Sequence, residues 1–114
     1  MLNMRQSKTK LNALQNRTLA LFQELAKSEE TSFRVEGTDD ISIMYIALPH
    51  GNHAHIGNFV VSAREASGFN NESVWKALER KGLARSEYPH RLILTRQGLC
   101  YETGFADTFN VSDH

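Results

Sequence analysis

The chain has 114 residues, of which 40% are hydrophobic and 23% charged, and this suits a single domain over residues 1–114. Thirteen Lys and Arg balance thirteen Asp and Glu, and this zero net charge argues against nucleic-acid binding, because phosphate neutralisation normally shows as an excess of Lys and Arg. One cysteine excludes an intramolecular disulfide, and neither a signal peptide nor a run of about 20 apolar residues is evident. We therefore expect a cytoplasmic protein without a membrane partner.

The N-terminal part predicts one amphipathic helix over residues 10–26, after a polar stretch over residues 1–8 that we expect to be loose. Apolar residues recur at helical spacing at Leu11, Leu14, Leu21, Phe22 and Leu25. The favoured interpretation is a scaffold helix that buries this face in the core.

Two extended segments follow. Residues 33–36 alternate between apolar and polar side chains, and residues 41–48 are almost continuously apolar. Residues 37–40 between them have turn chemistry, with one glycine and two aspartates. We expect a β-hairpin whose second strand is largely buried.

Three histidines lie close together in the next segment, at His50, His53 and His55. An extended chain would place His53 and His55 on one side, which is compatible with two ligands of a zinc ion. The segment has no carboxylate and the chain has no paired cysteines, so a structural loop is the favoured interpretation and zinc the alternative. A pH-sensitive contact is a third interpretation, because histidines titrate at about pH 6.5.

Residues 62–81 predict two consecutive helices. Ser62 and Glu65 form a capping-box pattern for a short helix that ends at Gly68. Asn70 is the expected N-cap of a second helix from about residue 72 to residue 81, and Gly82 follows as its C′ residue.

The second helix has one apolar side and one polar side. Val74, Ala77 and Leu78 fall together on a helical wheel. The opposite side carries Glu72, Ser73, Lys76, Glu79 and Arg80. Trp75 lies on the flank, where we expect a partly buried packing residue; an exposed aromatic at a partner surface is the alternative.

After Gly82 the pattern changes to that of strands. Residues 83–85 and 91–94 flank a turn-like segment over residues 86–90, which predicts a β-hairpin with a five-residue loop. Thr95 is the expected N-cap of a last helix that ends near Thr103, and we expect the tail over residues 110–114 to be loose.

The segment VWKALERKGLAR, followed by a hairpin and LILTRQG, resembles the closing half of winged helix-turn-helix regulators. The matching residues are Leu78, Lys81, Gly82, Leu83, Leu94, Thr95 and Gly98. Arg64 and Ser67 depart from the family pattern, which has small or buried residues there. The resemblance implies an α+β fold, a winged helix-turn-helix with an additional β-hairpin between the first helix and the helix-turn-helix. It also implies a homodimer that pairs through terminal helices.

The resemblance further implies a small transcriptional regulator that reads duplex DNA with the helix near residues 71–81 and the hairpin near residues 84–94. Cations concentrate between residues 74 and 96 although the whole chain is neutral, whereas acids concentrate between residues 29 and 40. The candidate DNA-binding residues are Asn70, Asn71, Ser73, Lys76, Arg80, Arg85, His90 and Arg91. Amide side chains suit adenine, and the hairpin cations suit the DNA backbone.

Two other classes of function have less support. The sequence has no phosphate-binding glycine loop, no nucleophile elbow, no His-Glu-x-x-His and no paired-cysteine motif, so we expect neither an enzyme nor a cofactor. The neutral net charge, together with Glu72 and Glu79 on the expected DNA-reading face, leaves open a winged-helix module that binds another protein instead of DNA.

Overall fold

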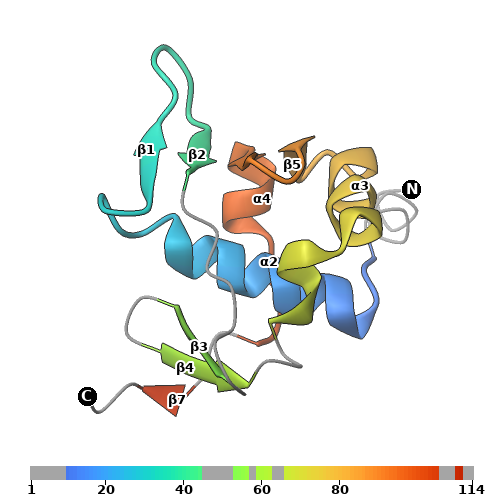
Figure 1. Ribbon diagram of the computed structural model, residues 1–114. Helices are drawn as coiled ribbons and strands as arrows, with labels where there is room; N and C mark the ends of the chain where they lie inside the picture. Colours follow the sequence, from blue (N-terminus) through green and yellow to red (C-terminus); the bar gives the residue numbers. More distant parts are fainter. Residues whose placement is uncertain (1–9, 45–52, 57–58, 63–65, 106–109, 112–114) are drawn as a thin grey trace.

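The structure, a computed structural model, describes residues 10–44, 53–56, 59–62, 66–105 and 110–111, with side chains in 10–44 and 66–105. These residues form an α+β fold. Its helices are α2 (Ala13–Leu25), the 3-10 helix η1 (Ser67–Asn70), α3 (Glu72–Arg80) and α4 (Arg96–Cys100). Two antiparallel sheets complete it, and Figure 1 shows them on opposite sides of α2.

Helix α2 begins at a capping box and confirms the predicted N-terminal helix. The Asn12 Oδ1 accepts from the Gln15 N–H at 2.8 Å, and the Gln15 Oε1 accepts from the Asn12 N–H at 3.0 Å. Its buried apolar residues include Leu19, Leu21, Phe22 and Leu25. This apolar face packs against other elements of the same chain, which favours the scaffold interpretation. The homodimer itself stays a prediction.

A four-stranded sheet joins the two predicted hairpins. Strand β1 (Ser32–Arg34) pairs with β2 (Ile41–Ile43), β2 with β6 (Arg91–Leu94), and β6 with β5 (Ala84–Glu87). The register places Ile41 opposite Leu94. Both hairpins are confirmed, although the strands of the first are shorter than predicted within the described residues and residues 45–48 lie outside them. The loop of the second hairpin is also shorter than predicted, because Glu87 pairs with Arg91 and only residues 88–90 turn the chain.

A second sheet corrects two expectations. Strand β3 (His53–Ile56) pairs with β4 (Phe59–Ser62), and β4 pairs with β7 (Asn110–Val111). The histidine segment therefore contributes a strand, and residues 110–111 are paired instead of loose. These strands are too short for an alternating pattern to emerge from the sequence.

The predicted helix from Ser62 to Gly68 is wrong at both ends, since Gly68 lies inside a helical turn instead of ending one. Ser62 ends strand β4, and the helical turn that precedes α3 is η1. Residues 63–65, with the predicted capping residue Glu65, lie outside the described residues. The apolar run over residues 59–61 holds two valines, whose strand preference outweighs the capping-box pattern at Ser62.

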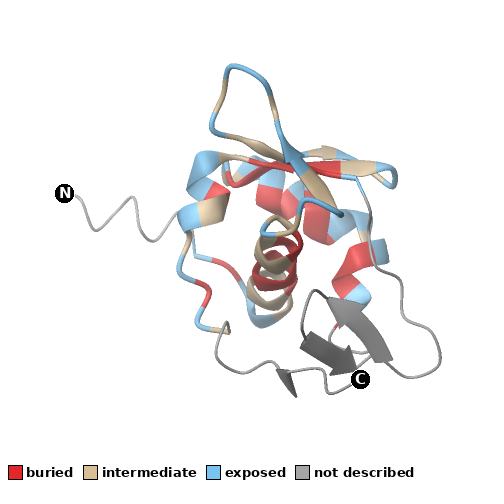
Figure 2. Cartoon of the chain, turned by 90° about the vertical axis from the view of Figure 1, so that its left-hand side faces the viewer, coloured by how far each residue is buried: buried red, intermediate tan, exposed pale blue. Residues whose placement is uncertain are grey.

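The buried residues gather between α2, α3 and the four-stranded sheet (Figure 2). Phe22 of α2 contacts Phe69 of η1 and Trp75 of α3 edge-on, with ring centroids 5.0 and 5.5 Å apart. Aromatic pairs in this arrangement stabilise a core beyond their buried area. The rings thus fix α3 on α2 and leave its other side to solvent.

A helix needs about 20 predominantly apolar residues to cross a bilayer. None of the helices in the described part of the chain meets that requirement.

Candidate nucleic-acid interface

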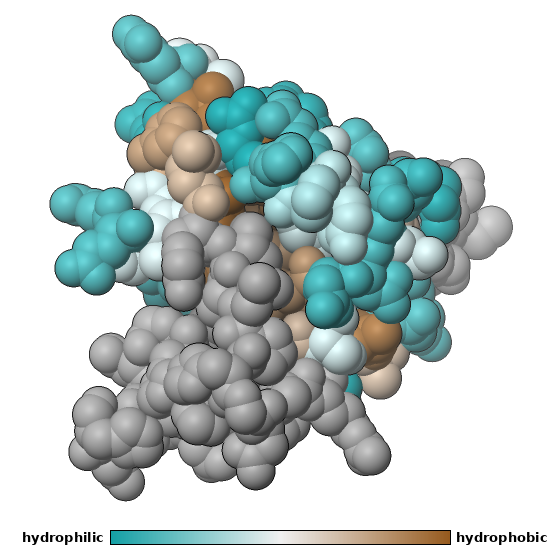
Figure 3. Space-filling view, in the orientation of Figure 1, coloured by the Kyte–Doolittle hydropathy of each residue, from teal (hydrophilic) through white to brown (hydrophobic). Residues whose placement is uncertain are grey.

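Helix α3 presents a polar side to solvent, as the sequence predicts. The residues that pack on the core are Val74, Trp75, Ala77 and Leu78. The exposed residues are Glu72, Ser73, Lys76, Glu79 and Arg80. In Figure 3, hydrophilic side chains cover the region of α3. Three of the predicted DNA-binding residues, Ser73, Lys76 and Arg80, therefore share one accessible surface.

The start of α3 is capped by Asn71, one residue later than predicted. The Asn71 Oδ1 accepts from the Ser73 N–H at 3.0 Å. The Asn71 N–H donates to the Gly68 carbonyl at 3.2 Å, so this residue closes η1 and opens α3. Asn70 is instead the exposed last residue of η1. Capping leaves Asn71 only its amide nitrogen for a base contact, whereas the side chain of Asn70 has no such structural role.

Tyr88 fastens the tip of the β5–β6 hairpin to the start of α3. Its hydroxyl donates to the Asn70 carbonyl at 3.0 Å, and its ring lies edge-on to Trp75 with centroids 4.9 Å apart. His90, in the same turn, is exposed, and its backbone N–H donates to the Glu87 carbonyl at 2.9 Å. Tyr88 thereby joins the turn that holds His90 to Asn70, two predicted site residues on separate elements. We call Asn70, the exposed residues of α3 and residues 85–91 the α3–hairpin face.

Two cations of the α3–hairpin face are paired with acids of the same face. The Lys76 Nζ lies 3.6 Å from the Glu72 carboxylate. The Arg91 guanidinium makes two hydrogen bonds to the Glu87 carboxylate, at 2.9 and 3.1 Å. The positive charge that the sequence concentrates between residues 74 and 96 is therefore offset locally, and the face is charged without being uniformly positive.

Arg85 is paired with an acid from a distant part of the sequence. Its guanidinium lies 3.3 Å from the Asp40 carboxylate, whose side chain is only 16% exposed. A carboxylate shielded from water attracts a cation more strongly than an exposed one. The acidic segment over residues 29–40 reaches the hairpin because β2 pairs with β6. The ion pair with Asp40 therefore competes with any phosphate contact that Arg85 could make.

Arg80 is exposed in the last turn of α3, and none of the ion pairs found among the described residues includes it. An exposed pair such as that of Lys76 contributes only roughly 0.2–1 kcal/mol, whereas the two hydrogen bonds of Arg91 make a firmer pair. An anion that reached Arg80 would therefore break none of these ion pairs, and one that reached Lys76 would replace a weak one.

Trp75 is fully buried, which makes the exposed-aromatic alternative wrong. Its Nε1 donates to the Gly68 carbonyl at 3.1 Å, and its ring lies between those of Phe22 and Tyr88. The side chain thus connects α2, η1, α3 and the hairpin tip. As the single tryptophan of the chain, it reports on the packing of all four.

The predicted metal ligands fall largely outside the described residues. His50 lies outside them, and so do the side chains of His53 and His55, whose backbone forms β3. Among the side chains that are described, no three from His, Cys, Asp and Glu come together as metal ligands. Zinc binding by this segment stays a prediction.

Two residues that shape the face have little sequence signal. Tyr88 sits in a turn of mostly polar residues, where an aromatic ring before a proline is the one hint of an anchoring role. Asp40 reads as an ordinary turn residue, because its partner Arg85 lies far along the chain. Only the strand pairing reveals that contact.

Tyr88→Phe is expected to lower the free energy of unfolding by about 0.5–1 kcal/mol, because the Asn70 carbonyl loses its hydroxyl donor while the ring stays on Trp75. Tyr88→Ala also removes the ring and is expected to cost more. Urea denaturation followed by circular dichroism measures both. Equal losses for the two variants would contradict the role of the ring, and an unchanged Tyr88→Phe would contradict that of the hydroxyl.

No protein-family model matches the chain, and comparisons with curated proteins and with solved structures found no match.

Proposed function

We propose that the chain binds duplex DNA as a winged helix-turn-helix protein and acts as a transcriptional regulator. The order of elements supports this, because α2, β2, η1, α3 and the β5–β6 hairpin occur in the order helix, strand, helix, helix and wing, with β1 before β2 and the β3–β4 pair between β2 and η1 as additional strands. Pairing of β2 with β6 extends the wing into a sheet. Helix η1 takes the place of the first helix of the helix-turn-helix, and β1–β2 is the additional hairpin.

The observation that carries the proposal is the Tyr88 contact, which joins the turn of the hairpin to Asn70 and Trp75 at the start of α3. In this class of protein the second helix lies in the major groove with its N-terminal residues nearest the bases. Asn70 and Ser73 are at that end of α3, while Lys76 and Arg80 lie one turn apart farther along its exposed side. His90 and Arg91 lie in the hairpin, where wings contact the DNA backbone or minor groove.

A salt series tests this proposal. We expect the protein to bind a duplex of mixed sequence at low salt, with log affinity falling by about 0.9 per log unit of salt for each phosphate contacted. Fluorescence anisotropy of a labelled duplex between about 50 and 200 mM salt measures it. A single strand of the same length is the control and is expected to bind more weakly. A folded protein that leaves the duplex free at the lowest salt contradicts the proposal.

A second candidate function is a winged-helix module that binds another protein. The balance of charges on α3 favours it, since Glu72 and Glu79 share the exposed side with Lys76 and Arg80. The hairpin of β1 and β2 also exposes two apolar side chains, Phe33 at 49% and Met44 at 53%. The same salt series separates the two candidates, because a protein-binding module shows no salt-dependent affinity for duplex DNA.

A further inference from the structure

Strand β1 leaves one edge of the four-stranded sheet open. Among the described strands it pairs only with β2, and Figure 1 shows the turn between the two projecting from the rest of the molecule. The Val35 N–H donates to the Asp40 carbonyl at 2.9 Å, so Val35 turns its backbone groups toward β2. These groups alternate between the two edges of a strand, so those of Ser32 and Arg34 point away from β2. Such an edge accepts a further strand by hydrogen bonding.

Two exposed apolar side chains lie beside this edge. Phe33 is 49% exposed and Met44 is 53% exposed. Phe33 lies opposite Ser42 in the register, and the Ser42 hydroxyl lies 3.8 Å from the Met44 Sδ, which places the three side chains on one side of the sheet. Figure 3 shows brown side chains beside teal ones in the region of this hairpin. An apolar side chain on an added strand would shield Phe33 and Met44 from water.

Acidic side chains flank β1 at both ends. Glu29 and Glu30 precede the strand and Glu36 follows it, and all three are exposed. None of the ion pairs found among the described residues includes these acids. Arg34, in the strand itself, lies 3.9 Å from the Asp39 carboxylate, which offsets its charge. The edge of β1 therefore has an apolar middle between two negative ends.

The charges decide which kind of partner fits this edge. A second copy of the chain that paired through β1 would bring the same acids of both copies together, and like charges repel. A strand with cations at its two ends would meet opposite charges instead. We propose that the edge of β1 binds a cationic peptide segment in an extended conformation, with apolar residues beside Phe33 and cations toward Glu30 and Glu36. The proposal depends on neither DNA nor the α3–hairpin face, so it can fail separately from the proposed function.

Titration of isotope-labelled protein with the end-capped peptide Lys-Lys-Val-Val-Val-Lys-Lys, followed by NMR, tests the site. The peptide is expected to shift the amides of residues 29–36 and of Met44. Lys-Lys-Pro-Val-Pro-Lys-Lys keeps the charge but lacks the N–H groups that would pair with β1, whereas Glu-Glu-Val-Val-Val-Glu-Glu keeps the strand-forming middle and reverses the charge. Both controls are expected to bind at least about tenfold more weakly. Equal affinity for either control, or a folded protein that shifts with no peptide, overturns the proposal.

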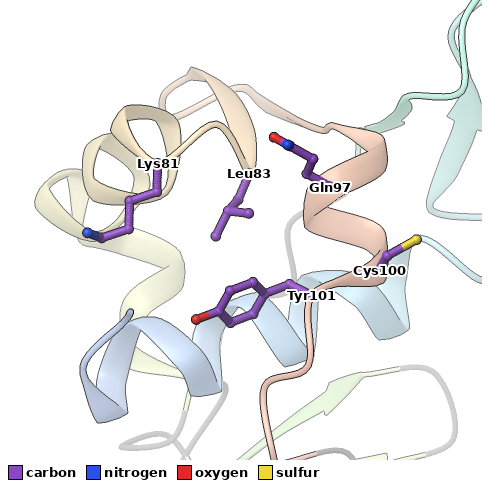
Figure 4. Close-up of a pocket in the computed structure, with 5 residues that line it drawn as sticks. All are labelled: Lys81, Leu83, Gln97, Cys100 and Tyr101. Atoms are coloured by element: carbon purple, nitrogen blue, oxygen red, sulfur yellow. The ribbon is translucent and has the colours of Figure 1, made fainter. Parts of the chain in front are cut away.

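A hollow elsewhere in the protein is the internal control. It has a volume of about 310 Å³, lies between the end of α3 and α4 (Figure 4), and is lined by Lys81, Leu83, Gln97, Cys100 and Tyr101. None of these lining residues is acidic, so the hollow offers the peptide no opposite charge, and its amides are expected to stay unshifted. Shifts that cluster there overturn the proposal. Shifts of residues 29–36 that depend on protein concentration without any peptide also overturn it, because a second copy would then cover the edge.

Charge variants locate the contact. Glu30→Gln combined with Glu36→Gln is expected to weaken binding of the lysine peptide about fivefold. Glu79→Gln combined with Glu102→Gln makes the same change in net charge at two other exposed acids and is expected to leave binding unchanged. Phe33→Ser removes the apolar contact and is expected to weaken binding by a similar factor. Equal losses in the two double variants, or unchanged binding in Phe33→Ser, overturns the proposal.

Discussion

Gly68→Ala is expected to lower the free energy of unfolding by about 3 kcal/mol, the upper part of the range for overpacked cores. A Cβ at this position would lie 1.9 Å from the Thr18 Oγ1 and 2.9 Å from the Thr18 Cβ and Cγ2. Thr18 is fully buried in α2, so relief requires η1 to move off α2. Urea denaturation followed by Trp75 fluorescence measures the change, because Trp75 donates to the Gly68 carbonyl.

A second substitution shows whether this close approach is the cause. Thr18→Ala removes the Oγ1 and Cγ2 atoms, so Gly68→Ala combined with Thr18→Ala is expected to recover most of the lost stability. The Thr18 hydroxyl has no hydrogen-bond partner among the residues that the structure describes, and its removal is therefore expected to cost little polar energy. A double variant no more stable than Gly68→Ala alone contradicts the packing of η1 on α2.

Gly37→Ala is the matched control for the loss of a glycine. An added Cβ there meets nothing within 4 Å, and the residue has a φ of 80°. Gly37→Ala is expected to lower the free energy of unfolding by about 1 kcal/mol, and this loss comes from the left-handed backbone conformation alone. If Gly68→Ala costs no more than Gly37→Ala, the steric explanation is wrong.

Charge reversal of Lys76 and Arg80 to Glu is expected to weaken duplex binding about a hundredfold at low salt and to reduce the salt slope by about 2. The two side chains are exposed on the same side of α3, so each reversal removes a phosphate contact and adds repulsion. The free energy of unfolding is expected to change by no more than about 0.5 kcal/mol for each residue. Anisotropy and urea denaturation on the same preparation measure both quantities.

Lys10→Glu combined with Lys27→Glu is the control for net charge. It makes the same change in charge beyond the two ends of α2. The Lys27–Glu24 pair is shorter than the Lys76–Glu72 pair, at 2.8 against 3.6 Å, and the Glu24 side chain is only 11% exposed, so urea denaturation of this double variant is measured as well. This pair of reversals is expected to weaken duplex binding far less. Equal losses of duplex affinity in the two double variants would mean that affinity follows total charge. The α3–hairpin face would then not be the DNA-binding surface.

Helix α3 could be predicted from the sequence because its signals are local. Asparagines precede it, its apolar residues share one side, and Gly82 follows it with a φ of 77°, as a C′ glycine does. The same holds for the capping box of α2 and for Thr95, whose Oγ1 accepts from the Gly98 N–H at 3.1 Å. Such interactions join residues a few positions apart, so the spacing of residue types reveals them.

The remaining features depend on contacts between distant residues. Pairing of β2 with β6 sets Asp40 beside Arg85, and no periodicity within either strand indicates it. The hydrogen bond from Tyr88 to the Asn70 carbonyl depends on the position of the β5–β6 hairpin beside α3. At Ser62 a local capping pattern conflicts with a strand-forming run, and the pairing of β4 with β3 and β7 decides the outcome.

Chemical-shift mapping with a short duplex at low salt tests most directly whether α3 and the β5–β6 hairpin bind DNA together. We predict that the amides that shift on addition of the duplex cluster at residues 70–81 and 86–91, while those around Lys27 stay unchanged. Shifts that cluster elsewhere, or a folded protein whose spectrum the duplex leaves unaltered, would contradict a DNA interface on this face.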